Sequence, residues 1–283
     1  MKVRSKRRRF MIWIGVAFAI YLAVCFGLAQ MYLHPPRTEE VTGERNRAVT
    51  IGEAPAWVID AKNPKAIFVL CHGYGGSRQA WEEVALRLSE RGYTSIIPSM
   101  PAHGENPDQD VGFGIKESKI ASLCAKHARQ QHPGLPVIGV GVSLGGAAVW
   151  LASDSFDGVA TEGTFPTMDQ ATDAFLDSAL PFGHITFRPV KWIAEWRSGI
   201  PSSSIRPIDK VRKWKGKPAL VMHGTGDRLF PLEFGEQISH ELGVELWRIE
   251  GAAHAYGFDV AGTRYIDKLD DLAQQCGKQV PEM

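Results

Sequence analysis

The chain has 283 residues, of which 44% are hydrophobic, so it is long and apolar enough for one large α/β domain or two small ones. Its 32 basic and 31 acidic residues give a net charge of +1, which argues against a nucleic-acid-binding protein. The near balance hides a local excess, because residues 1–9, MKVRSKRRR, form a basic tail.

Residues 10–33 contain no charged side chain. As a helix they would be about 36 Å long, enough to cross a hydrocarbon core of about 30 Å. A soluble core helix would show a polar face, so we predict a single-pass transmembrane signal anchor with a cytoplasmic N-terminus and an extracytoplasmic remainder. The alternative is a signal peptide cleaved near Gly27-Leu28-Ala29, which would release a secreted protein.

A polar, proline-broken stretch follows at 34–47 and is interpreted as a linker, so the globular domain is expected at 48–283. In that domain short apolar runs alternate with amphipathic segments, which predicts a mainly parallel central sheet covered by helices on both faces. The predicted strands are 65–73, 93–100, 135–143, 156–165, 217–227 and 245–254, and the clearest helices are 77–92, 231–243 and about 259–277.

One segment, about 166–207, breaks this alternation and is rich in proline and aromatic residues. A connection of this length in a compact domain is usually functional, so we interpret it as a lid. Its aromatic side chains either pack the lid onto the domain or build an apolar pocket that opens toward the bilayer. They are Phe175, Phe182, Phe187, Trp192 and Trp196.

The motif GVSLG, residues 141–145, places Ser143 where a predicted strand turns into a helix. A sharp corner of this kind exposes the serine oxygen, and the start of the helix offers free N–H groups. An incidental serine in a tight turn would give the same pattern. A dinucleotide-binding G-x-G-x-x-G is not supported, because its third glycine would fall at Leu144.

Other polar groups also follow predicted strands, at the edge where parallel sheets hold their chemistry. The loop HGYGG, residues 72–76, can aim the Tyr74 N–H, together with the Leu144 N–H, at a developing oxyanion. HGTGD delivers Asp227 and GAAHAYGF delivers His254. His103 is the main competitor of His254 for the catalytic role. His72 and His223 are interpreted as structural residues that brace their loops. The remaining histidines lie in the linker, in or beside helices, or in the lid, and are weaker candidates.

The chain order Ser143, Asp227, His254 resembles that of the α/β-hydrolase superfamily over about residues 48–277. The resemblance is greatest to lipases and esterases of the monoacylglycerol-lipase-like kind, including membrane-anchored examples. It implies a serine nucleophile, a histidine base oriented by the aspartate, and an oxyanion hole of the Tyr74 and Leu144 amides. The loop after the second predicted strand departs from the usual pattern, since it reads HGEN, and this affects the substrate rather than the chemistry.

We therefore expect a serine hydrolase acting on carboxylic esters or thioesters, with lipid-like acyl groups favoured by the membrane tether. A proline-type aminopeptidase or amidase on the same triad and a non-catalytic binding protein on the same scaffold remain alternatives. No organic cofactor or metal is expected, because no His- or carboxylate-rich cluster has ligand spacing. The four cysteines show no CxxC pair and are expected to be buried thiols, with a Cys124–Cys276 disulfide as the alternative.

Overall fold

The computed structural model describes residues 2–278 and places eight strands in one sheet of order β1-β2-β4-β3-β5-β6-β7-β8. The strands from β4 through β8 run parallel, whereas β1 and β2 are antiparallel to their neighbours. The predicted mainly parallel sheet is therefore confirmed. The strands are β1 (Arg47–Ile51), β2 (Ala54–Ile59), β3 (Ala66–Cys71), β4 (Tyr93–Pro98), β5 (Val137–Val142), β6 (Gly158–Glu162), β7 (Ala219–Gly224) and β8 (Leu246–Ile249).

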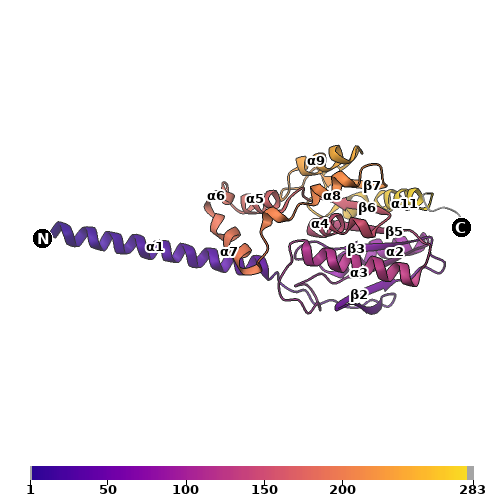
Figure 1. Ribbon diagram of the computed structural model, residues 1–283, viewed down its shortest axis with the longest axis horizontal. Coiled ribbons are helices and arrows are strands. Elements are labelled where there is room, and N and C mark those ends of the chain that lie inside the picture. The colour runs from indigo at the N-terminus through magenta and orange to yellow at the C-terminus, as the bar shows by residue number, and fades with distance from the viewer. Residues whose placement is uncertain (1, 279–283) are drawn as a thin grey trace.

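Helices cover both faces of the sheet, as Figure 1 shows. One face carries α3 (Ile115–Gln131), α4 (Leu144–Leu151), α8 (Pro207–Lys213) and α9 (Leu232–Leu242). The other carries α2 (Glu82–Glu90) and α11 (Thr263–Gly277). Shorter segments are α10 (Gly257–Ala261) and the 3-10 turns η1 (Arg78–Trp81) and η2 (Ser153–Ser155).

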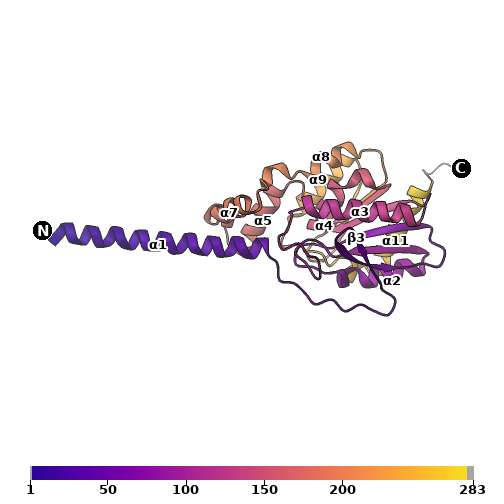
Figure 2. The ribbon, with the colours of Figure 1, turned by 60° about the horizontal axis from the view of Figure 1, so that its bottom comes forward.

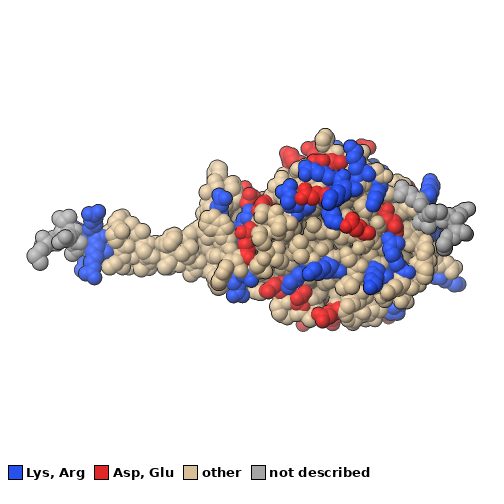
Figure 3. All heavy atoms as spheres, viewed as in Figure 1, with Lys and Arg blue, Asp and Glu red and all other residues tan. Residues whose placement is uncertain are grey.

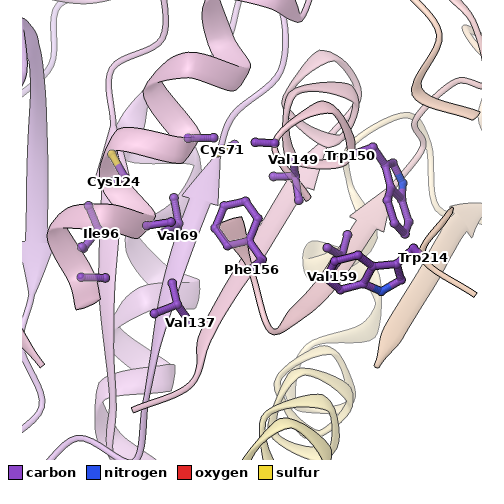
Figure 4. Packing of buried hydrophobic residues seen from close by; sticks show 14 of the residues in the cluster. Val69, Cys71, Ile96, Cys124, Val137, Val149, Trp150, Phe156, Val159 and Trp214 are labelled. Carbon is purple, nitrogen blue, oxygen red and sulfur yellow. The ribbon is translucent and has the colours of Figure 1, made fainter. Parts of the chain in front are cut away.

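The core on the α3–α4 face shows why the strands read as continuous apolar runs in the sequence. Val69 of β3 and Val137 of β5 are fully buried in one cluster with Phe156 and Val149 of α4, and Trp150 of α4 packs against Trp214 at the other side of this cluster, with ring centroids 6.3 Å apart (Figure 4). Because the sheet is covered on both faces, every residue of β3 to β6 is buried, and no polar alternation remains.

Several predicted boundaries differ from the structure. The hairpin β1–β2 was not predicted, because β1 is a largely exposed edge strand and β2 contains Pro55, which weakens the strand signal. Most of the predicted strands extend past the observed ends, since the following residues turn into the loops at the sheet edge. The helix predicted over 77–92 begins as η1, and Ser77 makes no side-chain cap.

The four cysteines are free and buried. Cys124 lies on α3 at one face of the sheet and Cys276 on α11 at the other, so the alternative disulfide between them is wrong.

The N-terminal helix α1 (Lys2–Leu33) projects from the domain, and the predicted lid lies beside its C-terminal part in both views (Figures 1 and 2). It is long and apolar enough to cross a membrane. The lid segment is helical rather than a loop. It comprises α5 (Met168–Ala179), α6 (Gly183–Thr186), α7 (Arg188–Ser198) and η3 (Ser202–Ser204).

Residues 34–46 have no regular helix or strand, yet they are fastened to the domain. The Arg37 guanidinium donates to the backbone carbonyls of three residues that follow β4, Gly104, Asn106 and Asp108. Glu40 accepts hydrogen bonds from the backbone and side chain of the buried Arg78, at 2.6 and 2.8 Å. The segment therefore holds α1 in a fixed relation to the sheet.

Candidate active site

The corner between β5 and α4 presents Ser143 in a strained conformation, with φ 54° and ψ −120°. Gly141 and Gly145 of the motif leave no room for a side chain, because neighbouring backbone occupies the space. A Cβ on Gly141 would lie 2.3 Å from the Gly145 carbonyl oxygen, and one on Gly145 would lie 2.2 Å from the Cys71 carbonyl oxygen. The Ser143 N–H donates to the Glu162 carbonyl at 2.9 Å, which ties the corner to β6.

Asp227 and His254 meet after the last two strands. The Nδ1 of His254 lies 2.7 Å from Oδ2 of Asp227, while Oδ1 of Asp227 accepts the N–H groups of Leu229 and Phe230 at 2.9 Å each. Burial alone would raise the pKa of Asp227, but hydrogen bonds from His223 and His254 hold it far below its ordinary range. The aspartate is therefore an anion that fixes the orientation of the imidazole.

Ser143 and His254 line the same cavity. Within residues 2–278 no hydrogen bond joins the serine hydroxyl to the ring, so the hydroxyl is open to the cavity. Contacts of this kind often tighten only when substrate binds. The edge of the Phe230 ring lies against the His254 ring, with centroids 5.0 Å apart, and limits the movement of the imidazole.

The loop after β3 is braced by two histidines. His72 contacts the Gly73 carbonyl through Nδ1 at 2.9 Å and accepts the Met100 N–H through Nε2 at 3.2 Å. His103 contacts the Pro101 carbonyl through Nδ1 at 2.7 Å and accepts the Gly75 N–H through Nε2 at 2.8 Å. Both rings are committed to backbone partners, so His103 has no free nitrogen to compete with His254.

These contacts require neutral imidazoles. Burial, followed by the neighbouring His103 ring, lowers the pKa of His72 to about 3, and burial also lowers the pKa of His103. The two rings form an edge contact with centroids 5.0 Å apart, so a proton on either would repel the other. His223 is also a brace, with Nε2 3.2 Å from the Phe230 carbonyl and 3.4 Å from Oδ2 of Asp227.

The two amides predicted to hold an oxyanion are available. Leu144 is the first residue of α4, where an N–H has no partner within the helix. The amides of Gly75 and Gly76 are paired, with His103 and the Gly73 carbonyl, and no acceptor for the Tyr74 N–H lies among the described residues. Tyr74 and Leu144 both line the cavity beside Ser143.

The cavity has a volume of about 580 Å³, within the usual range for small-molecule sites. Aromatic and aliphatic side chains form much of its wall. They include Tyr32, Phe113, Phe165, Met168, Phe175 and Phe230.

The aromatic residues of the lid divide between two surroundings. Phe175 lines the cavity and Phe187 is partly buried against the lid core, whereas Phe182, Trp192 and Trp196 are exposed. For these three residues both interpretations made from the sequence, lid packing and cavity building, are wrong.

Sequence reasoning missed Glu162, a buried carboxylate at the end of β6 that also lines the cavity. It accepts the Gly257 N–H at 2.7 Å and the Tyr265 hydroxyl at 3.0 Å. Burial raises its pKa, although these two hydrogen bonds and the attraction of His254 oppose the rise. Its position at a strand end, where the other site residues were sought, was the available signal.

Among residues 2–278, no group of three or more His, Cys, Asp or Glu side chains is placed to hold a metal ion. The polar groups that converge on the cavity suit acid–base and nucleophilic chemistry instead.

The sequence matches the alpha/beta hydrolase family over residues 68–267, so the chain belongs to this family. Its fold is similar to that of an esterase from Pyrococcus furiosus, with a TM-score of 0.66 at 19% identity, covering 86% of this chain and 97% of that one. It is also similar to the esterase Est2 of the planctomycete Thermogutta terrifontis with butyrate bound, with a TM-score of 0.64 at 15% identity, covering 85% and 97%.

A third similar structure is the protein TT1662 from Thermus thermophilus, with a TM-score of 0.61 at 19% identity, covering 81% of this chain and 98% of that one. At such identities the likeness concerns the fold. The predicted α/β-hydrolase fold is thus confirmed by the family and by the sheet.

Proposed function

We propose that this chain is a serine hydrolase that cleaves carboxylic esters or thioesters of lipid-like acyl groups through an acyl-enzyme on Ser143. The observation that carries the proposal is the 2.7 Å bond between His254 and the buried Asp227, at the cavity into which Ser143 opens. The esterases of similar fold are consistent with this reaction.

In the proposed mechanism His254 removes the Ser143 proton as the serine oxygen attacks the acyl carbonyl. The Asp227 carboxylate stabilises the resulting imidazolium, and the Tyr74 and Leu144 amides bind the oxyanion. The imidazolium then protonates the leaving alcohol or thiol, and the acyl-enzyme remains. Water attacks it with His254 again as base, which releases the acid and restores the serine.

We also propose that α1 is retained as a membrane anchor, with the basic tail in the cytoplasm and the catalytic domain on the other side. The anchor is apolar along its whole length from Phe10 to Leu33, and it begins directly after four basic residues, Lys6 to Arg9. An enzyme held at a bilayer is suited to acyl substrates that partition there.

The test combines labelling with a substrate series. A fluorophosphonate probe is expected to label the full-length chain in detergent but not Ser143→Ala, while absence of labelling in both would favour a binding protein. p-Nitrophenyl esters of increasing acyl length are then compared with amino-acyl anilides. A preference for the anilides would replace the esterase assignment by an aminopeptidase or amidase.

A further inference from the structure

The outer half of α1 is part of the folded domain rather than a free tether. Cys25, Ala29 and Leu33, spaced four residues apart on one face, are almost completely buried in the cluster that includes the α7 residues Val190 and Ala194. One turn before Cys25, the Tyr21 hydroxyl donates to the Thr186 carbonyl at the end of α6. The lid is therefore packed along α1 from Tyr21 to Leu33 (Figures 1 and 2).

The position of this contact along the helix sets its depth in a membrane. Tyr21 lies about 17 Å along the helix from Phe10, and a hydrocarbon core is about 30 Å thick. If the core begins at Phe10 it ends near Ala29, and if it ends at Leu33 it begins near Ile14. Tyr21 and Cys25 lie inside the core in both cases, so the lid residues that contact them lie there too.

The outward surface of the lid has the composition that this depth requires. Among the residues that the structure describes, five of the nine large apolar side chains exposed outside α1 lie in the short stretch 180–196. Phe182 is 71% exposed, Ile185 63%, Trp192 56% and Trp196 75%. Monomeric soluble proteins rarely gather such residues in one place unless they meet another apolar phase. We call Phe182, Ile185, Trp192 and Trp196 the lid patch.

Two arginines near the lid patch have long side chains that can reach a membrane surface, while the exposed Asp177 and His184 are paired with each other at 2.7 Å. The Arg188 guanidinium lies 5.6 Å from the centre of the Trp192 ring, and Arg197 is exposed in the last turn of α7. Arginine and tryptophan together are typical of the interface between hydrocarbon and headgroups. Figure 3 shows that α1, between its basic start and the lid, presents no charged side chain on the side in view.

α1 also contributes directly to the candidate active site. Tyr32 lines the cavity, in ring contact with Phe113, Tyr74 and Phe175 at centroid distances of 5.1, 5.9 and 5.4 Å. The Tyr74 hydroxyl donates to the Met31 carbonyl at 2.9 Å. Because Tyr74 also supplies a proposed oxyanion amide, removal of α1 would open the cavity and release this loop.

We propose that α6 and α7 are immersed in the same bilayer that α1 spans, with α1 fixing their depth and forming part of the cavity wall. The lid patch contacts the acyl chains of the lipids and the interface with their headgroups. The inference rests on the membrane anchoring proposed above, and it adds a second membrane contact and a reason for α1 to stay attached.

Tryptophan fluorescence in vesicles containing phosphatidylcholine brominated on its acyl chains tests the docking. Trp13 lies in α1, so Trp13→Phe leaves reporters only in the domain and lid. Bromine is expected to reduce the emission of Trp13→Phe, and the reduction should disappear when Trp192→Phe and Trp196→Phe are added. The control combines Trp13→Phe with Trp247→Phe, which removes a half-buried tryptophan on β8, and in this control bromine should still reduce the emission. Emission that bromine does not reduce in Trp13→Phe would overturn the proposal.

The measurement needs no turnover, so the same quenching is expected when Ser143→Ala is added. Hydrolysis provides the second readout: Trp192→Ser with Trp196→Ser should retain activity on a short soluble ester and lose several-fold activity on a monoacyl ester embedded in vesicles. Quenching without any hydrolysis would overturn the esterase assignment alone. Hydrolysis of the soluble ester without quenching would overturn the docking alone.

Discussion

Replacing His72 by glutamine should make the protein less sensitive to acid. The pKa of the buried His72 is about 3 in the folded protein, against 6.5 for an ordinary histidine. Above pH 6.5 the ring is neutral in both states and contributes no pH dependence. As the pH falls from 6.5 towards 3, the unfolded chain takes up a proton that the folded protein excludes, so stability decreases.

The size of this effect follows from linkage. Once the unfolded state binds one more proton, the free energy of unfolding falls by about 1.4 kcal/mol per pH unit, which amounts to about 2 kcal/mol between pH 6.5 and 4.5 because the unfolded ring is only half protonated at pH 6.5. Glutamine does not titrate, and it can still donate to the Gly73 carbonyl or accept the Met100 N–H. His72→Gln is therefore expected to lose some stability at pH 8 but to lose less than the wild type on acidification.

The assay is urea unfolding of the full-length protein in detergent, followed by tryptophan fluorescence from pH 4.5 to 8. The matched control is His240→Gln, which removes an exposed ring on α9 and should leave the pH dependence unchanged. The reasoning would be refuted by wild-type and His72→Gln curves that run parallel over this range.

Three further changes have defined outcomes. Asp227→Asn keeps an acceptor for the turn but no longer fixes the tautomer of His254, so kcat/KM for a p-nitrophenyl ester should fall about 10⁴-fold with unchanged circular dichroism. Gly145→Ala places a Cβ 2.2 Å from a carbonyl oxygen of β3 and should destabilise the fold by about 1–3 kcal/mol in thermal unfolding, whereas Gly277→Ala, with no atom within 4 Å of the added carbon, should not. Glu162→Gln should stabilise the protein at neutral pH, since the raised pKa means that the buried carboxylate is ionised at a cost, and the gain should vanish below about pH 4.5, where the unfolded carboxyl is protonated as well. Urea unfolding of the wild type and Glu162→Gln between pH 4 and 8 measures this difference, and a difference that does not change with pH would count against the argument.

The sheet could be predicted because β3 to β6 are buried on both faces and β7 over most of its length, so these strands are largely apolar and lie next to glycines. The same logic failed for β1 and β2, where exposure and Pro55 remove the pattern. Ser143, Asp227 and His254 could be selected because parallel strands bring their carboxyl ends to one edge, so that chain order alone placed them together.

Contacts between distant segments left no such signal. Nothing in the sequence near Tyr32 indicates that α1 reaches the cavity, because this depends on how the lid packs. The burial of Glu162 could not be read from the sequence, because it depends on α10 and Tyr265, which cover the carboxylate. The exposure of Trp192 and Trp196 could not be separated from burial, because both are apolar on a helix of mixed composition.

The segment 34–46, held to the domain by Arg37 and by the Glu40–Arg78 pair, leaves the α/β domain little freedom to move relative to α1. A loose tether of the same length would let the domain swing and sample molecules some nanometres away. With α1 as the proposed anchor, the proposed hydrolase would instead meet its substrates by lateral diffusion in its own membrane. Molecules in an apposed membrane would be out of range, and the supply of acyl groups would be set by the composition of the membrane that holds the anchor.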